Sequence, residues 1–183
     1  MGKSTAAQIL RERGAAVVDT DDLARQVVAP GQPALAEVQQ AFGPGIIGQD
    51  GQLRRAELAR LVFSDAVARQ RLEAILHPRI RQLWIDQLQA WRQESKAFAV
   101  VVIPLLFETR AEASFEAVVC VACSAATQRE RLYTRGWTVE QMERRNAAQL
   151  PVADKMLRSS YVIWTEGGMD VHAQQWERML SAV

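Results

Sequence analysis

Four short apolar runs, with no polar residue alternating inside them, constrain the fold of this chain most strongly. They are AAVVD at 15–19, FAVVVIPLL at 98–106, AVVCVA at 117–122 and YVIW at 161–164. A strand that faces water on one side alternates apolar and polar residues, so continuous apolar runs indicate strands covered on both faces. Segments of helical character separate or follow these runs. The order is typical of an α/β domain in which helices cover a parallel sheet.

Acidic side chains stand where two of these runs end. Asp19, Asp21 and Asp22 close the first run, and Glu108 follows the second. In open parallel sheets, ligands bind beyond the carboxyl ends of the strands. The sequence therefore predicts a ligand site bordered by these carboxylates.

The chain opens with MGKSTAAQIL, in which Gly2, Lys3, Ser4 and Thr5 match the second half of a phosphate-binding loop, G-x-x-x-x-G-K-[ST]. Residues 6–11 all favour a helix, so we expect a helix that begins at the glycine and turns its free N–H groups towards a phosphate. In such a loop the lysine reaches the β- and γ-phosphates, and the hydroxyl that follows it holds Mg²⁺. The alternative is an ordinary N-capped helix with a solvated lysine.

Composition and charge narrow the class of protein. The 183 residues are 49% hydrophobic and 23% charged, which is typical of a folded globular domain, and the net charge of +1 argues against a nucleic-acid or membrane surface. Arginines nevertheless crowd into 54–81 and 129–145, a distribution that suits a small polyanionic ligand. No apolar run approaches the ~18 residues of a membrane span, and we expect a cytoplasmic protein without an obligate protein partner.

Cys120 and Cys123 form a C-x-x-C pair within VVCVAC. A zinc site would need further ligands, and the sequence has no second pair. Because Cys120 falls inside an apolar strand-like run rather than at an exposed helix start, a redox role is disfavoured. We expect both cysteines to be structural.

Two helical insertions interrupt the strand pattern. The first spans about 25–97, and Pro78 is expected to open a new helix there, with Trp84 and Trp91 on its core-facing stripe. The second spans about 125–157 and is expected to form a helical hairpin, with a capping box that starts its second helix at 138–141. Its arginines suit a mobile lid that covers a ligand and a solvated charged hairpin about equally well.

The order of these motifs resembles the dephospho-CoA kinase family. The matching segments are GKST at 2–5, VVDTDDLARQVVAPGQPAL at 17–35, FGPGIIGQDGQLRRAELARLVF at 42–63, LEAILHPRI at 72–80, IPLLFE at 103–108, QRERLYTRG at 128–136 and RNAAQ at 145–149. They cover nearly the whole chain in order. The resemblance implies a P-loop NTPase-type three-layer αβα parallel sheet with a helical substrate-binding insertion and a helical lid. On that basis the kinase core is expected at 1–24, 98–124 and 158–183, the coenzyme A-binding helical domain at 25–97, and the lid at 125–157.

The resemblance also implies a reaction, in which the γ-phosphate of ATP passes to the ribose 3′-hydroxyl of dephospho-coenzyme A in the final step of coenzyme A biosynthesis. The expected cofactors are ATP and Mg²⁺. Residues expected to hold ATP are Gly2, Lys3, Ser4, Thr5, Arg135 and Arg145, with Ser4 on the metal. Residues expected to act in catalysis are Asp21, which accepts or orients the hydroxyl proton, Lys3 and Arg135. Residues expected to meet the acceptor are Asp19, Asp21, Arg55, His77, Leu106 and Glu108.

Several of these assignments have alternatives. Asp21 could instead be a turn aspartate that caps the next helix. Arg135 and Arg145 could form surface ion pairs, and Arg55 could be a solvated helix arginine. A neutral core histidine is the slightly favoured role for His77. For the whole protein, one competing function is a nucleotide- or coenzyme A-binding module that is catalytically impaired because the first half of the loop is missing. The other is a different small-molecule P-loop kinase.

Three features depart from the family pattern. The strand and first half of the loop that precede G-K-S in the family have no counterpart before Met1, and we expect them to be encoded just upstream. Val102 stands where many members have an aspartate, so a carboxylate near the metal has to come from elsewhere, with Asp19 and Asp21 as candidates. The segment YVIWTEGG at 161–168 lacks the family's usual asparagine before the glycine, which affects the adenine side of the site.

Overall fold

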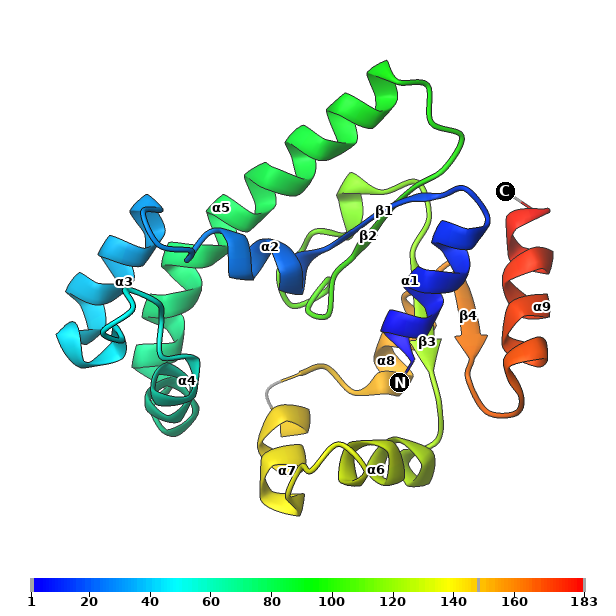
Figure 1. Cartoon of the computed structure of the whole chain (residues 1–183). Coiled ribbons are helices and arrows are strands. Elements are labelled where there is room, and N and C mark those ends of the chain that lie inside the picture. Colours follow the sequence, from blue (N-terminus) through cyan, green and yellow to red (C-terminus); the bar gives the residue numbers. More distant parts are fainter. Residues whose placement is uncertain (1, 148, 183) are drawn as a thin grey trace. The chain divides into compact units, whose positions relative to one another are not determined.

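The computed structural model describes residues 2–147 and 149–182, without the side chains of Ser64 and Arg145 (Figure 1). This part of the chain divides into two compact units. Unit 1 consists of Met1–Ala15 and Pro104–Val183, and unit 2 consists of Ala16–Ile103. The expected division into core, helical domain and lid is a different division of the chain, and it remains a prediction.

Unit 1 carries the start and the second half of the chain. Its elements are α1 (Lys3–Glu12), the short 3₁₀ helix η2 (Glu112–Ser114), β3 (Val119–Ala122), α6 (Ala125–Tyr133), α7 (Val139–Ala147), α8 (Val152–Leu157), β4 (Tyr161–Trp164) and α9 (Met169–Leu180). Strands β3 and β4 pair in parallel, with Val119 opposite Tyr161 and Ala122 opposite Trp164. Helix α9 packs against β4 and α1, and α8 packs against β3.

The outer edge of β4 is covered by a side chain. The amide of Gln175 accepts a hydrogen bond from the Trp164 N–H at 2.8 Å and donates one to the Trp164 carbonyl at 2.8 Å. Gln175 thus takes the place that a neighbouring strand would have at Trp164. Because exposed strand edges can pair with other chains, this contact protects the end of the sheet.

Unit 2 contains the first sheet and the first helical insertion. Its elements are β1 (Ala16–Asp19), α2 (Thr20–Gln26), α3 (Pro33–Phe42), the 3₁₀ helix η1 (Pro44–Ile46), α4 (Arg55–Ser64), α5 (Ala66–Gln93) and β2 (Ala99–Val102). Strands β1 and β2 pair in parallel from Ala16 opposite Ala99 to Asp19 opposite Val102. The parallel pairing is as predicted, but the described residues form two two-stranded sheets rather than one continuous sheet.

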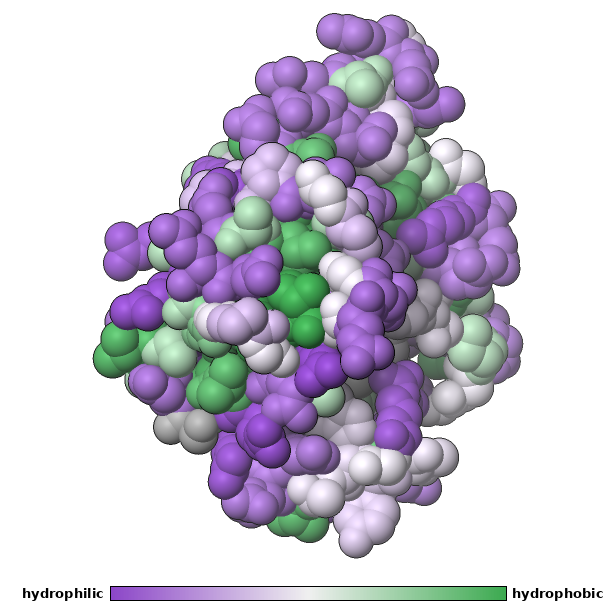
Figure 2. Space-filling model, turned by 60° about the vertical axis from the view of Figure 1, so that its left-hand side comes forward, coloured by the Kyte–Doolittle hydropathy of each residue, from purple (hydrophilic) through white to green (hydrophobic). Residues whose placement is uncertain are grey.

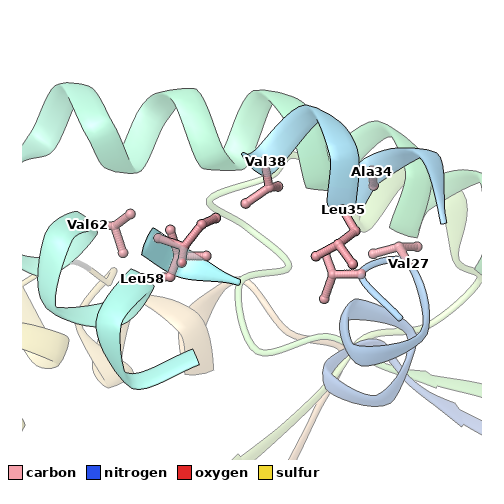
Figure 3. Packing of buried hydrophobic residues seen from close by; sticks show 8 residues of the cluster. Val27, Ala34, Leu35, Val38, Leu58 and Val62 are labelled. Carbon is pink, nitrogen blue, oxygen red and sulfur yellow. The ribbon is translucent and has the colours of Figure 1, made fainter. Parts of the chain in front are cut away.

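Apolar side chains of α3, η1 and α4, with two that follow α2, form the core of unit 2, and partly buried side chains of α5 pack against it (Figure 3). Its buried members are Val27, Val28, Ala34, Leu35, Val38, Ile46, Leu58 and Val62. Val38 is fully buried. Because burying a valine or leucine stabilises the folded state by about 1.5–3 kcal/mol, this cluster accounts for the compactness of the insertion.

The expectation that Pro78 opens a new helix was wrong. Pro78 lies inside α5, which runs without a break for 28 residues from Ala66 to Gln93. Proline removes one backbone hydrogen bond to the carbonyl four residues earlier, that of Ala74. Pro78 and Ala74 are both exposed, so water can replace that bond. The residues on either side, Leu76 and Ile80 among them, pack on the core and hold the helix together.

The second strand is shorter than its apolar run. The run spans 98–106, whereas β2 ends at Val102 and a series of turns follows. Pro104 explains the difference, because proline cannot donate to a strand ladder and restricts the residue before it. The strand at Tyr161–Trp164 matches its run, and Trp84 is buried, as expected for a core residue.

Two surface properties bear on the class of protein. Among the described helices, none has both the length and the apolar character that a bilayer crossing demands. Hydrophilic side chains cover most of the face shown in Figure 2, with apolar side chains exposed in places between them.

Candidate functional site

Helix α1 begins as the phosphate-loop motif predicts. Gly2 is its N-cap, with a left-handed backbone (φ 87°, ψ 13°), and the Gly2 carbonyl accepts the Ala6 N–H at 2.9 Å. Ser4 is exposed, and Lys3 and Thr5 are partly exposed. The apolar residues of the helix face the other way into the unit: Ala6, Ala7, Ile9 and Leu10 are buried. The first turn therefore offers its polar groups and free N–H groups to a ligand.

The loop after β4 packs directly on this first turn. Thr165 is 5% exposed, and its N–H donates to the Ala122 carbonyl at 2.8 Å. A Cβ atom placed on Gly2 would lie 3.3 Å from Thr165 Cγ2. A larger residue at position 2 would therefore meet Thr165 in addition to being strained by the positive φ.

A side chain of α6 holds Thr165 from the other side. Arg131 Nη1 donates to Thr165 Oγ1 at 2.9 Å, and Arg131 Nη2 donates to the Thr165 carbonyl at 2.6 Å. The next residue, Glu166, accepts the Ser124 N–H at 2.8 Å. Hydrogen bonds from Ser124 are the main reason that the pKa of Glu166 falls to about 2. Hydrogen bonds thus connect α6 with the loop after β4, and the start of α1 packs on Thr165 of that loop.

Glu108 makes a second polar cluster in unit 1. Its Oε1 lies 2.8 Å from Lys155 Nζ and accepts the Leu150 N–H at 2.9 Å. Lys155 also donates to the Pro104 carbonyl and to Gln149, each at 3.3 Å. Burial acts to raise the pKa of Glu108, but the hydrogen bonds from Lys155 and Leu150 outweigh it, and the pKa lies below its usual value. The other oxygen, Oε2, is buried without a hydrogen bond to any described residue.

Leu106 and Glu112 belong to the same stretch of chain. Leu106 is partly buried, and its carbonyl accepts the Ala111 N–H at 3.0 Å. Arg158 donates to Glu112 at 2.6 Å and lies over the ring of Phe107 at 4.3 Å from its centroid. Two ion pairs, Glu108–Lys155 and Glu112–Arg158, therefore tie α8 to the segment that follows Pro104.

The expected lid forms a helical hairpin made of α6 and α7. Thr138 and Gln141 form the predicted capping box, in which the Thr138 N–H donates to Gln141 Oε1 at 3.0 Å and the Gln141 N–H donates to Thr138 Oγ1 at 3.2 Å. Arg135 is exposed and makes no ion pair with any residue that the structure describes, whereas Arg144 pairs with Glu140. The side chain of Arg145 lies outside the described part of the chain.

Asp19 and Asp21 are placed by the end of β1, in unit 2. Asp19 is the N-cap of α2, and its Oδ1 accepts the Asp21 N–H at 2.9 Å. Asp21 is exposed in the first turn of that helix. The helix is capped by Asp19, so the alternative in which Asp21 is the capping residue is wrong. Beside them, Thr20 donates to the Val102 carbonyl at 3.0 Å and joins the ends of β1 and β2.

Arg55 and His77 also lie in unit 2. Arg55 is exposed as the first residue of α4, and His77 is partly buried within α5. The structure thus brings Gly2, Lys3, Ser4 and Thr5 together on one helical turn. It places Leu106, Glu108 and Arg135 in the same unit as that turn, and Asp19, Asp21, Arg55 and His77 in unit 2.

Sequence reasoning missed three residues that organise unit 1. Arg131 is one of several arginines in the hairpin, and its position in the sequence did not distinguish it from the others. Lys155 gave no signal, because its partner Glu108 is distant in sequence. His172 is buried at 5% exposure, and its Nε2 accepts the Trp176 Nε1–H at 3.1 Å. The i, i+4 spacing of His172 and Trp176 could have suggested that contact.

The cysteines show no sign of reactivity. Both thiols are free, and burial raises the pKa of Cys120, which disfavours its thiolate. Within residues 2–147 and 149–182, no three His, Cys, Asp or Glu side chains gather as metal ligands.

Comparison with known sequences assigns the family. The family model described as dephospho-CoA kinase matches residues 1–170. Dephospho-CoA kinase of Moorella thermoacetica is 43% identical over 171 residues, which cover 92% of this chain and 81% of that protein. Dephospho-CoA kinase of Anaeromyxobacter dehalogenans is 42% identical over 181 residues, which cover 98% of this chain and 86% of that protein.

Solved structures agree with the fold. The crystal structure of TT1252 from Thermus thermophilus has a TM-score of 0.83 and 31% sequence identity, and the match covers 100% of this chain and 92% of that one. Dephospho-CoA kinase from Campylobacter jejuni has a TM-score of 0.72 at 22% identity, over 98% of this chain and 90% of that one. These neighbours confirm the P-loop NTPase type of fold.

Proposed function

The chain belongs to the dephospho-CoA kinase family, and from that premise we propose how its own residues carry out the transfer of the ATP γ-phosphate to the ribose 3′-hydroxyl of dephospho-coenzyme A. The observation that carries the proposal is the start of α1, where Gly2 caps the helix in a left-handed conformation and the next three residues expose polar groups. Helix N-termini of this kind bind phosphate through free N–H groups and the helix dipole.

Lys3, on the first turn of α1, would reach the β- and γ-phosphates of ATP, and the backbone N–H groups of the same turn, including that of Thr5, would donate to phosphate oxygens. Phosphoryl transfer needs positioning and charge stabilisation more than covalent chemistry. The close packing of Gly2 on Thr165 supports this role, because it holds the turn that carries Lys3 in one conformation.

The donor set fits a magnesium ion that enters together with ATP. Mg²⁺ is usually held by one or two protein oxygens, with water and substrate phosphates completing its octahedron. The exposed hydroxyl of Ser4 is a suitable oxygen for this purpose. The ion would neutralise charge on the phosphates when bound.

Asp21 is the residue that we assign to the acceptor hydroxyl. It is exposed just beyond the carboxyl end of β1, and the N-cap role belongs to Asp19, so its carboxylate is left to accept or orient a proton. Arg55, His77, Leu106 and Glu108 are assigned to the binding of dephospho-coenzyme A. Of these, Arg55 has the most exposed side chain, as a phosphate contact requires, and Glu108 carries a buried oxygen that can accept a hydrogen bond.

Arg135 and Arg145 are assigned to the transferred phosphate. Arg135 is exposed on the helical hairpin, so it can approach a phosphate when the hairpin moves, and it has no competing ion pair within the described residues. We also propose a cytoplasmic location and small-molecule partners only, for which the near-neutral net charge of +1 is the support.

The test is to supply the purified chain with MgATP and dephospho-coenzyme A and to follow coenzyme A formation by liquid chromatography and mass spectrometry. Coenzyme A should form, and Lys3→Ala should abolish its formation without unfolding the protein. A parallel titration with each substrate separates binding from turnover. Binding without product would favour the non-catalytic module, and preferential phosphorylation of another nucleoside or sugar would favour a different small-molecule kinase.

A further inference from the structure

Arg131 is the described arginine of the hairpin that bonds inward to the loop after β4. Both terminal nitrogens of its guanidinium donate to one residue, Thr165, at 2.9 Å to the hydroxyl and 2.6 Å to the carbonyl. Thr165 is 5% exposed, so these bonds are made in a largely dry environment. Bonds from a charged donor in such a place are among the stronger hydrogen bonds in proteins.

Thr165 in turn restricts the phosphate-binding turn. Its Cγ2 is the atom that a Cβ on Gly2 would approach to 3.3 Å, and its backbone N–H is fixed to the Ala122 carbonyl at 2.8 Å. The Thr165 methyl group therefore faces Gly2, while the hydroxyl and carbonyl of the same residue bond to Arg131. The contacts form a continuous series from α6, through the loop after β4, to the residue that caps α1.

We propose that Arg131 is a positioning residue, which holds Thr165 against Gly2 and so keeps the first turn of α1 in the conformation that receives the phosphates of ATP. This role differs from that of Arg135, which is assigned to the transferred phosphate itself. It explains why an arginine of the hairpin is occupied by protein atoms rather than exposed. The kinetic part of the test rests on the proposed function.

The positive charge of Arg131 also affects a buried histidine of α9. His172 on α9 has its pKa lowered by burial and by the positive charge of Arg131. The charge of Arg131 thus acts on α9 in addition to the two bonds that its guanidinium makes to Thr165.

The experiment uses the full chain with three single variants and one double variant. Arg131→Met keeps the apolar stem and removes both donors. Thr165→Val keeps the shape that touches Gly2 and removes the hydroxyl. Arg129→Gln, on the exposed face of the same helix, is the matched control. The double variant combines Arg131→Met with Thr165→Val.

Kinetics give the first readout. Arg131→Met should raise the KM for ATP by roughly tenfold, the scale of a hydrogen bond to a charged group, and leave the KM for dephospho-coenzyme A within about twofold. Thr165→Val should raise the KM for ATP by a smaller factor, and the double variant should be no worse than Arg131→Met alone. Additive effects of the two substitutions would mean that Arg131 acts on ATP directly, and they would overturn the proposal.

Amide hydrogen exchange gives a readout that needs no turnover. The Ala6 N–H bonds to the Gly2 carbonyl at 2.9 Å, so its exchange reports on the first turn of α1. Exchange at Ala6 should be about fivefold faster in Arg131→Met and unchanged in Arg129→Gln. Unchanged exchange in Arg131→Met would overturn the proposal even if the protein were an active kinase. Faster exchange would support it even if the parent chain formed no coenzyme A.

Discussion

Lys155 Nζ lies 2.8 Å from Glu108 Oε1, and the two side chains are only 11% and 19% exposed. Because the Leu150 N–H bonds to the same oxygen, this one carboxylate fixes both α8 and the segment that returns from α7. The pair is the most buried ion pair of the described residues, and it joins Lys155, near the end of the expected lid at 125–157, to Glu108 in the expected core.

Removing one partner of this pair should destabilise the protein strongly. Lys155→Met leaves Glu108 charged, buried and without its cation, which typically costs about 3–5 kcal/mol of the free energy of unfolding. Arg144→Ala is the control, because Arg144 and Glu140 are exposed and their pair should contribute less than ~1 kcal/mol. Urea unfolding followed by circular dichroism measures both. Equal losses in the two variants would contradict the structural role of Lys155.

Asp21→Asn should lower kcat by roughly 10²–10⁴, the usual contribution of a general base. Substrate binding should change little, because the amide has the same size and Asp21 is exposed. Steady-state kinetics with ATP and dephospho-coenzyme A provide the measurement, with Asp22→Asn on the same turn as the control. Near-normal turnover in Asp21→Asn would remove Asp21 from the catalytic role.

Arg135→Ala should reduce kcat by at least about tenfold and leave the melting temperature nearly unchanged. Arginines that stabilise charge in phosphoryl transfer contribute a factor of this size or more. The side chain is exposed and contributes little to folding. The melting temperature and the turnover of the folded protein are measured side by side. A marked fall in melting temperature with full activity would show that Arg135 is structural.

Stability should fall in mild acid because of His172. Its pKa in the folded protein is lowered from 6.5, first by burial and then by the charge of Arg131. The unfolded chain therefore takes up the proton more readily than the folded protein does. The stability that neutral His172 contributes is present above a pH of about 6.5 and is lost as the pH falls from there through the folded pKa.

Urea unfolding at pH 7.5 and pH 5.5 tests this dependence. His172→Gln should show a smaller loss between the two pH values than the parent chain, since the titrating group is gone. His77→Gln serves as the control for the other histidine, which is only partly buried. An identical loss in the parent and in His172→Gln would exclude His172 as the cause.

Local patterns predicted the elements of this fold well. The glycine before Lys3 marked the start of α1, the run at 161–164 matched β4, and the spacing of Thr138 and Gln141 gave the capping box. Each of these signals depends on residues within one turn or one strand. Short-range stereochemistry determines such features, so they can be predicted without knowledge of the tertiary contacts.

Features that depend on distant contacts were predicted poorly. Pro78 suggested a helix start, but the packing of residues on both sides of it within the core keeps α5 continuous. The bonds of Arg131 to Thr165 and of Glu108 to Lys155 join residues that are 34 or more positions apart. No hydrophobic periodicity indicates such a pairing, so the sequence pointed to Glu108 without identifying Lys155 as its partner.

Gln175 closes one edge of the two-stranded sheet of unit 1 at Trp164. Both hydrogen-bonding groups that Trp164 turns outward are satisfied by one side chain of α9. A new strand could pair with this end of β4 only if Gln175 first gave up both bonds. One glutamine side chain of α9 therefore closes the end of the β4 edge without any further strand.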